Sequence, residues 1–225
     1  MATHQEIAGI TDADMVKRMV SGYENRFDES FWAFFADNVS PHFGPSPHLI
    51  DIGCGPGLFL RDLGRRFPGA SLFGFDITPA MIDYAGSQVD FGEQNPSLQV
   101  LDIATESLPN APGSADLITM TAVLHVLPDP LTVLGKVRQT LKTTGVFFLQ
   151  DWVRTPLPMY LERMLTDVPP ERRDTTLAAM LRLFPSHNKF TPDDWRWLLT
   201  EGGFEVCCEH ETNNPHFRTF VLRPH

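Results

Sequence analysis

From residue 48 onward, short and nearly continuous apolar runs alternate with segments of helical periodicity, and this alternation constrains the fold more than any other feature. Strands that are apolar on both faces are typical of a parallel sheet covered by helices on both sides. We therefore expect an α/β fold with a doubly wound sheet. The five predicted strands are HLIDI at 48–52, SLFGFDI at 71–77, SLQVLDI at 97–103, ADLITMT at 115–121 and GVFFLQD at 145–151.

The C-terminal part adds one strong helix signal and a closing hairpin. Thr191 is predicted to cap a helix, and Phe190 and Trp195 occupy the two positions of a hydrophobic staple around it. Two further strands are expected at 204–211 and 216–224. In an open sheet of this kind, ligands bind outside the carboxyl ends of the parallel strands, so the residues that follow each strand should converge on one site.

The turn after the first strand, DIGCGPG at 51–57, is rich in glycine and leads into a helix. Glycines permit positive φ and let a ligand approach the backbone closely. A dinucleotide-binding loop aligned on Gly53 would need its third glycine at position 58, which is Leu58. Asp51, two residues before Gly53, would face a pyrophosphate badly but suits a ligand that carries an ammonium group.

Two more carboxylates follow the next two strands. Asp76 lies 19 residues after Gly57, a spacing typical of an acid that accepts hydrogen bonds from both ribose hydroxyls of a nucleoside. Asp102 is placed to accept from the exocyclic amine of a purine. Together with Asp51, these residues predict a site for an adenosine that carries a positively charged tail.

At this point the sequence resembles the class I S-adenosylmethionine-dependent methyltransferases over roughly residues 45–225. The resemblance implies a Rossmann-like sheet of seven strands, mostly parallel and with an antiparallel last strand, and S-adenosylmethionine as cofactor. The motifs that carry it are DIGCGPG at 51–57, GFDIT at 74–78, LDI at 101–103, ADLITMTAVLHVLPDP at 115–130 and FTPDDWRWLLTEGGFEV at 190–206.

The resemblance also implies positions for the cofactor, with glycines beside the methionine portion, Asp76 on the ribose and Asp102 with Ile103 around the adenine. An N-terminal helical cap, residues 1–44, is expected to fold over a methyltransferase domain at 45–225. The aromatic residues of this cap recur at spacings close to one face of a helix, which would also suit packing against the sheet. The predicted cofactor-binding residues are Asp51, Gly53, Cys54, Gly55, Gly57, Asp76, Ile77, Met81, Asp102, Ile103, Thr121, Tyr23, Arg26 and Trp32.

A long insertion at about 154–189 follows the fifth strand and contains two predicted helices, at 158–166 and 171–184. Relatives use this region as a substrate lid, and its methionine and aromatic residues would form an adaptable apolar wall. The predicted substrate-contacting residues are Trp152, Arg154, Met159, Tyr160, Met180, Phe184 and Asn213.

The predicted catalytic residues are His125, Asp151 and His216, which follow strands or lie in the final hairpin. His125 suits a general base, or it anchors its loop. We expect methyl transfer to the oxygen or nitrogen of a small, partly hydrophobic acceptor, driven mainly by in-line orientation. The alternatives are a binding module without transfer, use of the cofactor as a fixed positive charge and, least favoured, an NAD(P)-dependent oxidoreductase.

Composition limits the partners. Eighteen Lys and Arg against 28 Asp and Glu give a net charge of −10, which disfavours nucleic acid and anionic membranes. The cysteines, Cys54, Cys207 and Cys208, form neither a disulfide framework nor a metal-ligand spacing, so we expect a reduced, cytoplasmic protein without a metal. The expected oligomeric state is a monomer or a homodimer.

Overall fold

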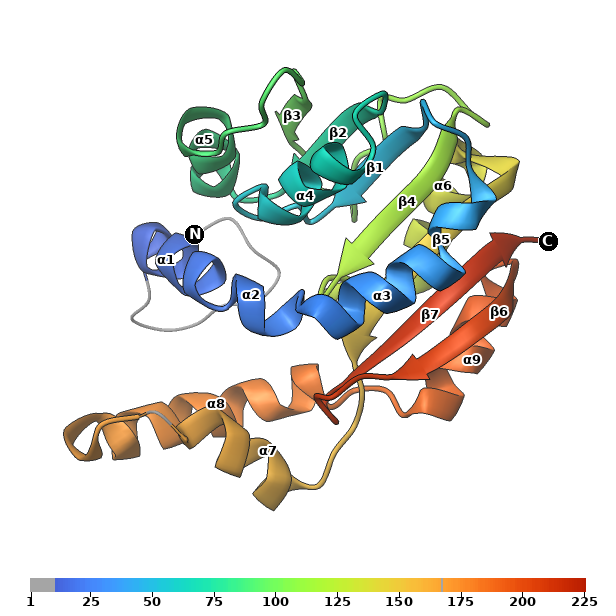
Figure 1. Ribbon diagram of the computed structural model, residues 1–225. Helices are drawn as coiled ribbons and strands as arrows, with labels where there is room; N and C mark the ends of the chain where they lie inside the picture. Colours follow the sequence, from blue (N-terminus) through green and yellow to red (C-terminus); the bar gives the residue numbers. More distant parts are fainter. Residues whose placement is uncertain (1–10, 167) are drawn as a thin grey trace.

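The computed structural model describes residues 11–166 and 168–225, so the first ten residues of the predicted cap and position 167 of the predicted lid lie outside the described residues. Its centre is a seven-stranded sheet in the order β3-β2-β1-β4-β5-β7-β6, flanked by helices (Figure 1). The strands are β1 His48–Ile52, β2 Ser71–Asp76, β3 Ser97–Val100, β4 Ala115–Thr121, β5 Leu141–Trp152, β6 Phe204–Glu211 and β7 Phe217–Pro224.

The pairing of the strands confirms the predicted doubly wound sheet. β1 pairs in parallel with β2 on one side and with β4 on the other, while β7 runs antiparallel to both β5 and β6. The strand order therefore reverses between β1 and β4. This switch point is where ligands bind in open α/β sheets.

Two strand boundaries differ from the prediction by more than one residue. β3 ends at Val100 rather than 103, because the carboxylate of Asp102 accepts a hydrogen bond from the backbone N–H of Ala104 (2.9 Å) and forms a turn. β5 begins at Leu141 rather than 145, since Leu141 pairs with Ala115 before the register shifts.

Most connections between strands are helical. The N-terminal segment forms α1 and α2, which lie beside the carboxyl ends of the strands, and α3, which packs on the sheet, while α7 and α8 project away from the sheet (Figure 1). The helices are α1 Asp12–Ser21, α2 Tyr23–Arg26, α3 Glu29–Asn38, η1 Ser40–His42, α4 Leu58–Arg66, α5 Pro79–Gln88, η2 Leu124–Val126, α6 Pro130–Thr140, α7 Leu157–Leu165, η3 Pro170–Arg172, α8 Arg173–His187 and α9 Pro192–Glu201. No helix in the described ranges is long and apolar enough to cross a membrane.

Helix α9 starts as predicted. The hydroxyl of Thr191 accepts from the backbone N–H of Asp194 (3.1 Å), and the Asp194 carboxylate accepts from the backbone N–H of Thr191 (2.7 Å). The rings of Phe190 and Trp195 lie 4.8 Å apart and form the staple.

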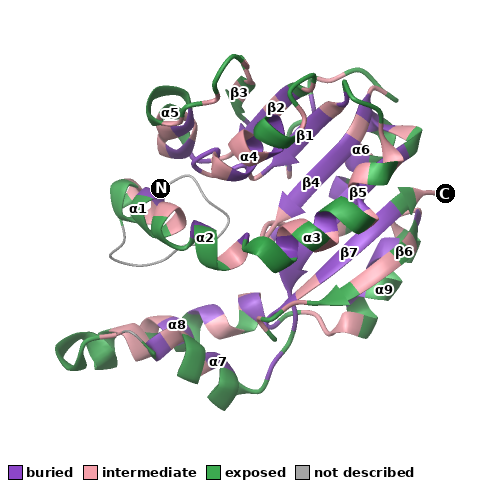
Figure 2. Cartoon of the chain, viewed as in Figure 1, coloured by how far each residue is buried: buried purple, intermediate pink, exposed green. Residues whose placement is uncertain are grey.

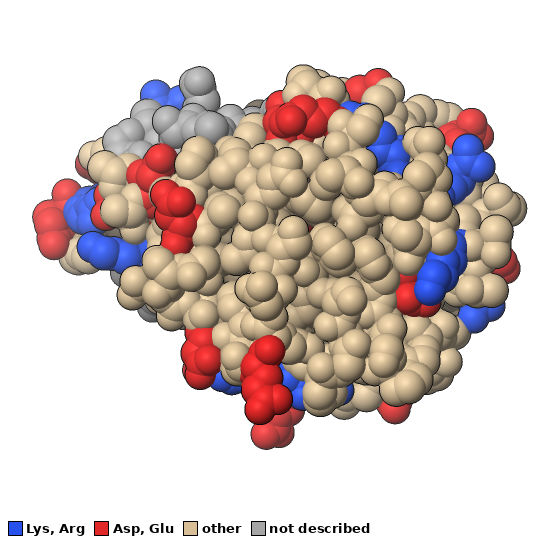
Figure 3. Space-filling view, turned by 90° about the horizontal axis from the view of Figure 1, so that it is seen from above, with Lys and Arg blue, Asp and Glu red and all other residues tan. Residues whose placement is uncertain are grey.

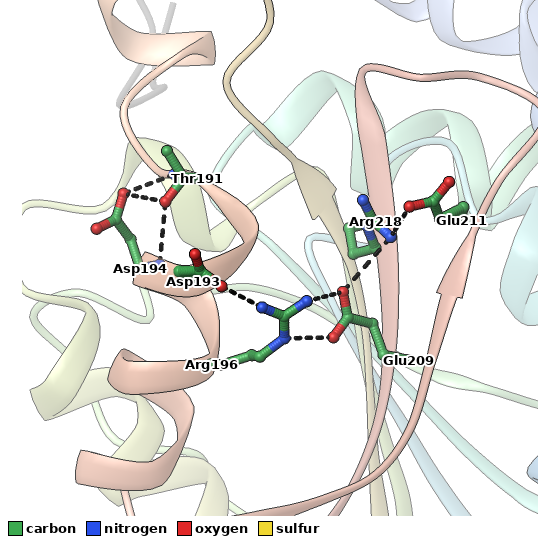
Figure 4. A network of polar contacts seen from close by, with 7 residues as sticks. All are labelled: Thr191, Asp193, Asp194, Arg196, Glu209, Glu211 and Arg218. Carbon is green, nitrogen blue, oxygen red and sulfur yellow. Dashed lines mark hydrogen bonds and ion pairs between the residues drawn. The ribbon is translucent and has the colours of Figure 1, made fainter.

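Ion pairs join α9 to the closing hairpin (Figure 4). Arg196 of α9 donates to Glu209 of β6 (2.7 Å) and also pairs with Asp193, and Arg218 of β7 contacts Glu209 and Glu211.

On the face shown in Figure 3, charged side chains of both signs surround a broad uncharged area.

The core lies on the two faces of the central strands, which are buried along their length (Figure 2). The predicted N-terminal aromatic residues contribute to the core on one face. Phe31 and Phe35 are buried and pack edge-on or tilted against Phe148 of β5, with ring centroids 5.7 and 5.5 Å from it. The packing interpretation of these aromatic residues is therefore confirmed for most of them.

Candidate active site

A cavity of about 1030 Å³ lies at the carboxyl ends of β1, β2, β4 and β5, on the side that α1, α2, α7 and α8 cover. Its walls are formed by the glycine loop, the ends of the strands, the lid and the turn between β6 and β7. The predicted site residues that line it are Tyr23, Arg26, Asp51, Gly53, Cys54, Gly55, Asp76, Ile77, Met81, Asp102, Ile103, Thr121, His125, Trp152 and Asn213.

The glycine loop requires glycine for two reasons. Gly53, Gly55 and Gly57 have φ of 73°, 53° and 79°, a region that other residues rarely adopt. At Gly53 a Cβ would also lie 2.2 Å from Cγ2 of Val123. Gly57 does not line the cavity; it precedes α4 and packs close to Ala85 of α5.

Asp76 is held at the end of β2 by the loop it faces. Its carboxylate accepts hydrogen bonds from the backbone N–H groups of Gly55 (2.9 Å) and Thr78 (2.8 Å), and burial raises its pKa. The Thr78 side chain also donates to this carboxylate, so of its roughly four acceptor positions one remains for a ribose hydroxyl. This arrangement fits the ribose of a nucleoside.

Asp51 is 1% exposed and accepts a hydrogen bond from the Thr119 hydroxyl (2.7 Å). Burial raises its pKa to about 7, the Thr119 hydrogen bond opposes this effect, and the charge of Asp76 adds to it. A cation brought into the cavity beside Asp51 would stabilise its ionised form. The site therefore fits the cationic tail expected of the cofactor.

Other predicted cofactor-binding residues also line the cavity. Ile103 and Met81 are buried at the cavity wall, and Asp102 lines it beside them. Burial raises the pKa of the Cys54 thiol well above its ordinary value. The thiol is therefore protonated at neutral pH and unsuited to nucleophilic attack.

The N-terminal helices cover part of the cavity. Tyr23 and Arg26 line it, and the Arg26 guanidinium lies over the ring of Phe217, 5.1 Å from its centroid. Desolvation lowers the pKa of Arg26 to about 10, so it remains charged at neutral pH. Trp32 is not at the cavity. It packs against Arg66, 3.5 Å from the ring centroid, because α3 turns that face of the helix toward α4.

His125 and Asp151 form a buried pair at the ends of β4 and β5. Nδ1 of His125 lies 2.7 Å from Oδ1 of Asp151, and the backbone N–H of His125 donates to Oδ2 (3.1 Å). The His125 side chain is 3% exposed, and its Nε2 has no hydrogen-bond partner among the described residues. Asp151 does not line the cavity, so it would affect a bound molecule only through its contact with His125.

His187 of the lid lies next to this pair and was missed by the sequence analysis. Its ring stacks on Trp152 with centroids 4.2 Å apart, and its Nδ1 is 2.8 Å from the Tyr160 hydroxyl. Burial, together with nearby positive groups, lowers its pKa to about 3, which keeps the ring neutral. His216 is bound to the Thr155 hydroxyl (2.8 Å) and lies outside the cavity lining.

None of the predicted substrate-contacting residues in the lid lines the cavity. Tyr160 and Met180 are buried in a cluster behind it, and Met159 is 42% exposed. Arg154 and Phe184 line a separate hollow, where Arg154 donates to two lid carbonyls. The lid and cap residues that do line the cavity include Met15, Arg18, Arg163, Met164, Leu183 and His187.

Comparisons with solved structures establish the class of fold. The chain matches a methyltransferase of Aquifex aeolicus described as dependent on S-adenosylmethionine, with a TM-score of 0.69 and 16% identity over 96% of this chain and 100% of that chain. It also matches human N-acetylserotonin methyltransferase in complex with S-adenosylmethionine, with a TM-score of 0.61 and 21% identity over 95% of this chain and 56% of that chain. At these identities the likeness shows the fold, that of the Rossmann-like methyltransferases.

Sequence comparison identifies the family. The profile of the family described as "Methyltransferase domain" matches residues 25–209. The chain therefore belongs to this family, and the predicted class I S-adenosylmethionine-dependent methyltransferase is confirmed.

Two curated relatives carry specific names. A ubiquinone biosynthesis O-methyltransferase of Xanthomonas campestris pv. campestris is 31% identical over 61% of this chain and 62% of that protein. A trans-aconitate 2-methyltransferase of Methylobacterium radiotolerans is 37% identical over 47% of this chain and 38% of that protein. The chain thus spans about three fifths or less of these relatives.

Proposed function

We propose that this chain transfers the methyl group of S-adenosylmethionine to an oxygen or nitrogen of a small, partly hydrophobic acceptor. The observation that carries the proposal is the position of the His125–Asp151 pair across one cavity from the glycine loop and from Asp51 and Asp76. The names of the relatives, which refer to ubiquinone biosynthesis and to trans-aconitate, support a small-molecule acceptor.

The cofactor end of the cavity would bind by complementary charge and hydrogen bonding. Asp76 would accept from a ribose hydroxyl, Asp51 would balance the ammonium group, and Asp102 would accept from the adenine amine. Arg26 is the cation available for the cofactor's carboxylate. When bound, the cofactor supplies a methyl group that is electrophilic because its sulfur is positively charged.

The chain's own residues orient the acceptor and accept its proton. Nε2 of His125 is the basic atom of the proposed site. The Asp151 carboxylate, 2.7 Å from Nδ1, would favour the tautomer that is protonated at Nδ1 and leaves Nε2 unprotonated, once the ring turns to donate to it. Trp152 and Leu183 add apolar walls that limit the entry of water. Proximity and alignment would supply most of the rate enhancement.

The binding part of the proposal is tested with Asp76→Ala. We expect calorimetry to show a loss of S-adenosylmethionine affinity of about tenfold or more, because a charge-assisted hydrogen bond to the ribose is removed. The circular dichroism spectrum should stay unchanged, and Asp83→Ala, an exposed site on α5, should bind normally. Unchanged affinity in Asp76→Ala would refute the ribose assignment.

The transfer part is tested with S-adenosylmethionine labelled in the methyl group. Label recovered in a small molecule, together with S-adenosylhomocysteine, would support methyl transfer. Binding without any release of S-adenosylhomocysteine would instead indicate a non-catalytic module. Turnover of an acceptor without label would indicate use of the cofactor as a fixed charge.

A further inference from the structure

The cavity has opposite charges at its two ends. Asp51 and Asp76 lie at the carboxyl ends of β1 and β2, and Asp102 follows β3, at the proposed cofactor end. The basic residues of the lining, Arg18, Arg26 and Arg163, come from α1, α2 and α7, the cap and the lid.

Two of these arginines change the pKa of titratable groups in the cap, the lid and the closing hairpin. The charge of Arg163 lowers the pKa of Arg26 and of His216, and the charge of Arg18 lowers the pKa of His187 and of Tyr160. In contrast, the pKa of Asp76 is set by burial and by its hydrogen bonds.

Arg18 and Arg163 are exposed to solvent and Arg26 is half-buried, and none of the three has the carboxylate partner that other cations of the chain have. Arg61 pairs with Asp62 (2.7 Å), and Lys142 pairs with Asp116 (2.7 Å). Arg18, Arg26 and Arg163 form no ion pair with a carboxylate of the described residues, although the chain has ten more acidic than basic residues.

An acceptor bound in the cavity would take these cations further out of water, so an anionic group on it would supply the counter-charge that they lack. Desolvation already lowers the pKa of Arg163 and Arg26. The cofactor brings one carboxylate, for which Arg26 is sufficient. Two cations, Arg18 and Arg163, then remain for the acceptor.

We propose that Arg163 of the lid and Arg18 of the cap bind an anionic group of the acceptor, a carboxylate or a phosphate, and so select acidic acceptors over neutral ones. This inference rests on the proposed methyl transfer and adds the acceptor's charge to it. A planar guanidinium binds either anion through paired N–H donors. Because Arg18 comes from α1 and Arg163 from α7, two contacts from separate elements would fix the acceptor in the cavity.

The test uses labelled S-adenosylmethionine and a mixture of polar metabolites separated on an anion exchanger. We expect label to appear in the retained, acidic fraction. Arg163→Gln and Arg18→Gln should each lower kcat/KM for the acceptor in that fraction by about tenfold or more, because each removes a charged hydrogen-bond donor. The affinity for S-adenosylmethionine should stay within about twofold of the parent.

Matched controls separate this effect from a general loss of charge or of folding. Lys17→Gln, next to Arg18 on α1, and Arg182→Gln, on lid helix α8, are exposed and do not line the cavity, so both should behave like the parent. Arg163→Lys should recover part of the activity, since it keeps the charge without the paired donors. Thermal unfolding of every variant checks that the fold is intact.

Treatment of the acidic fraction identifies the anion. Loss of acceptor activity after a phosphatase would identify a phosphate, and loss after amidation of carboxyl groups would identify a carboxylate. Label in the unbound fraction, or arginine variants equal to their controls, would overturn the inference and leave methyl transfer standing. Label in no fraction would overturn the proposed function and this inference with it.

Discussion

Gly53→Ala tests the physical account of the glycine loop, because two separate penalties meet at this residue. Its φ of 73° is left-handed, which costs a residue with a Cβ about 1–2 kcal/mol. The added Cβ would also lie 2.2 Å from Cγ2 of Val123, and forced overpacking of this kind costs about 1–3 kcal/mol. We expect Gly53→Ala to lower the free energy of unfolding by about 2–5 kcal/mol in total.

Gly55→Ala and Val123→Ala separate the two penalties. At Gly55 the φ is 53° and a Cβ would meet nothing within 4 Å, so only the backbone cost of about 1–2 kcal/mol should appear. Val123→Ala removes the methyl group that clashes. In the double variant Gly53→Ala/Val123→Ala the coupling energy should be about 1–3 kcal/mol in the favourable direction.

Urea denaturation of the four variants and the parent, followed by circular dichroism, supplies the measurements. The reasoning would be refuted if Gly53→Ala were no less stable than Gly55→Ala. It would fail equally if the double-variant cycle showed no coupling, since the contact between position 53 and Val123 would then carry no energy.

Two more predictions concern buried titratable groups. The pKa of Asp51 is raised in the folded protein from 3.8 to about 7, so the folded state binds more protons than the unfolded state in this window and stability should fall as the pH rises through it. Asp51→Asn should make the dependence of the urea midpoint on pH shallower between these values, and an equally steep fall would contradict the assigned cause. His125→Ala should lower turnover by about 10²–10⁴-fold without changing the affinity for S-adenosylmethionine, and a variant within about tenfold of the parent would exclude His125 as the base.

The cofactor half of the site was predictable because its geometry is local. In a parallel sheet the residue after each strand lies at the same edge, so Asp51 and Asp76 are brought together by strand pairing alone. Asp102 lies at the same edge even though β3 ended early, because the following turn keeps it beside the cavity.

The lid was less predictable because helical periodicity gives the faces of a helix but not which face meets the sheet. The second lid helix was predicted to end at residue 184, yet α8 continues through Pro185 to His187. That extra turn brings His187 onto Trp152, and Tyr160, expected at the substrate, binds His187 instead. No spacing in the sequence indicates such a contact between lid and sheet.

Backbone pairing, rather than the lid, sets the positions of His125 and Asp151. Thr121 pairs with Gln150 at the ends of β4 and β5, and the next residue, Ala122, has a φ of 58° while its N–H donates to the carbonyl of Gln150 (2.8 Å). Such a conformation costs a non-glycine residue free energy and persists only where its surroundings hold it. The turn directs η2 so that His125 meets the carboxylate that follows Gln150. Changes in the lid can therefore alter which acceptor is bound while this pair stays in place.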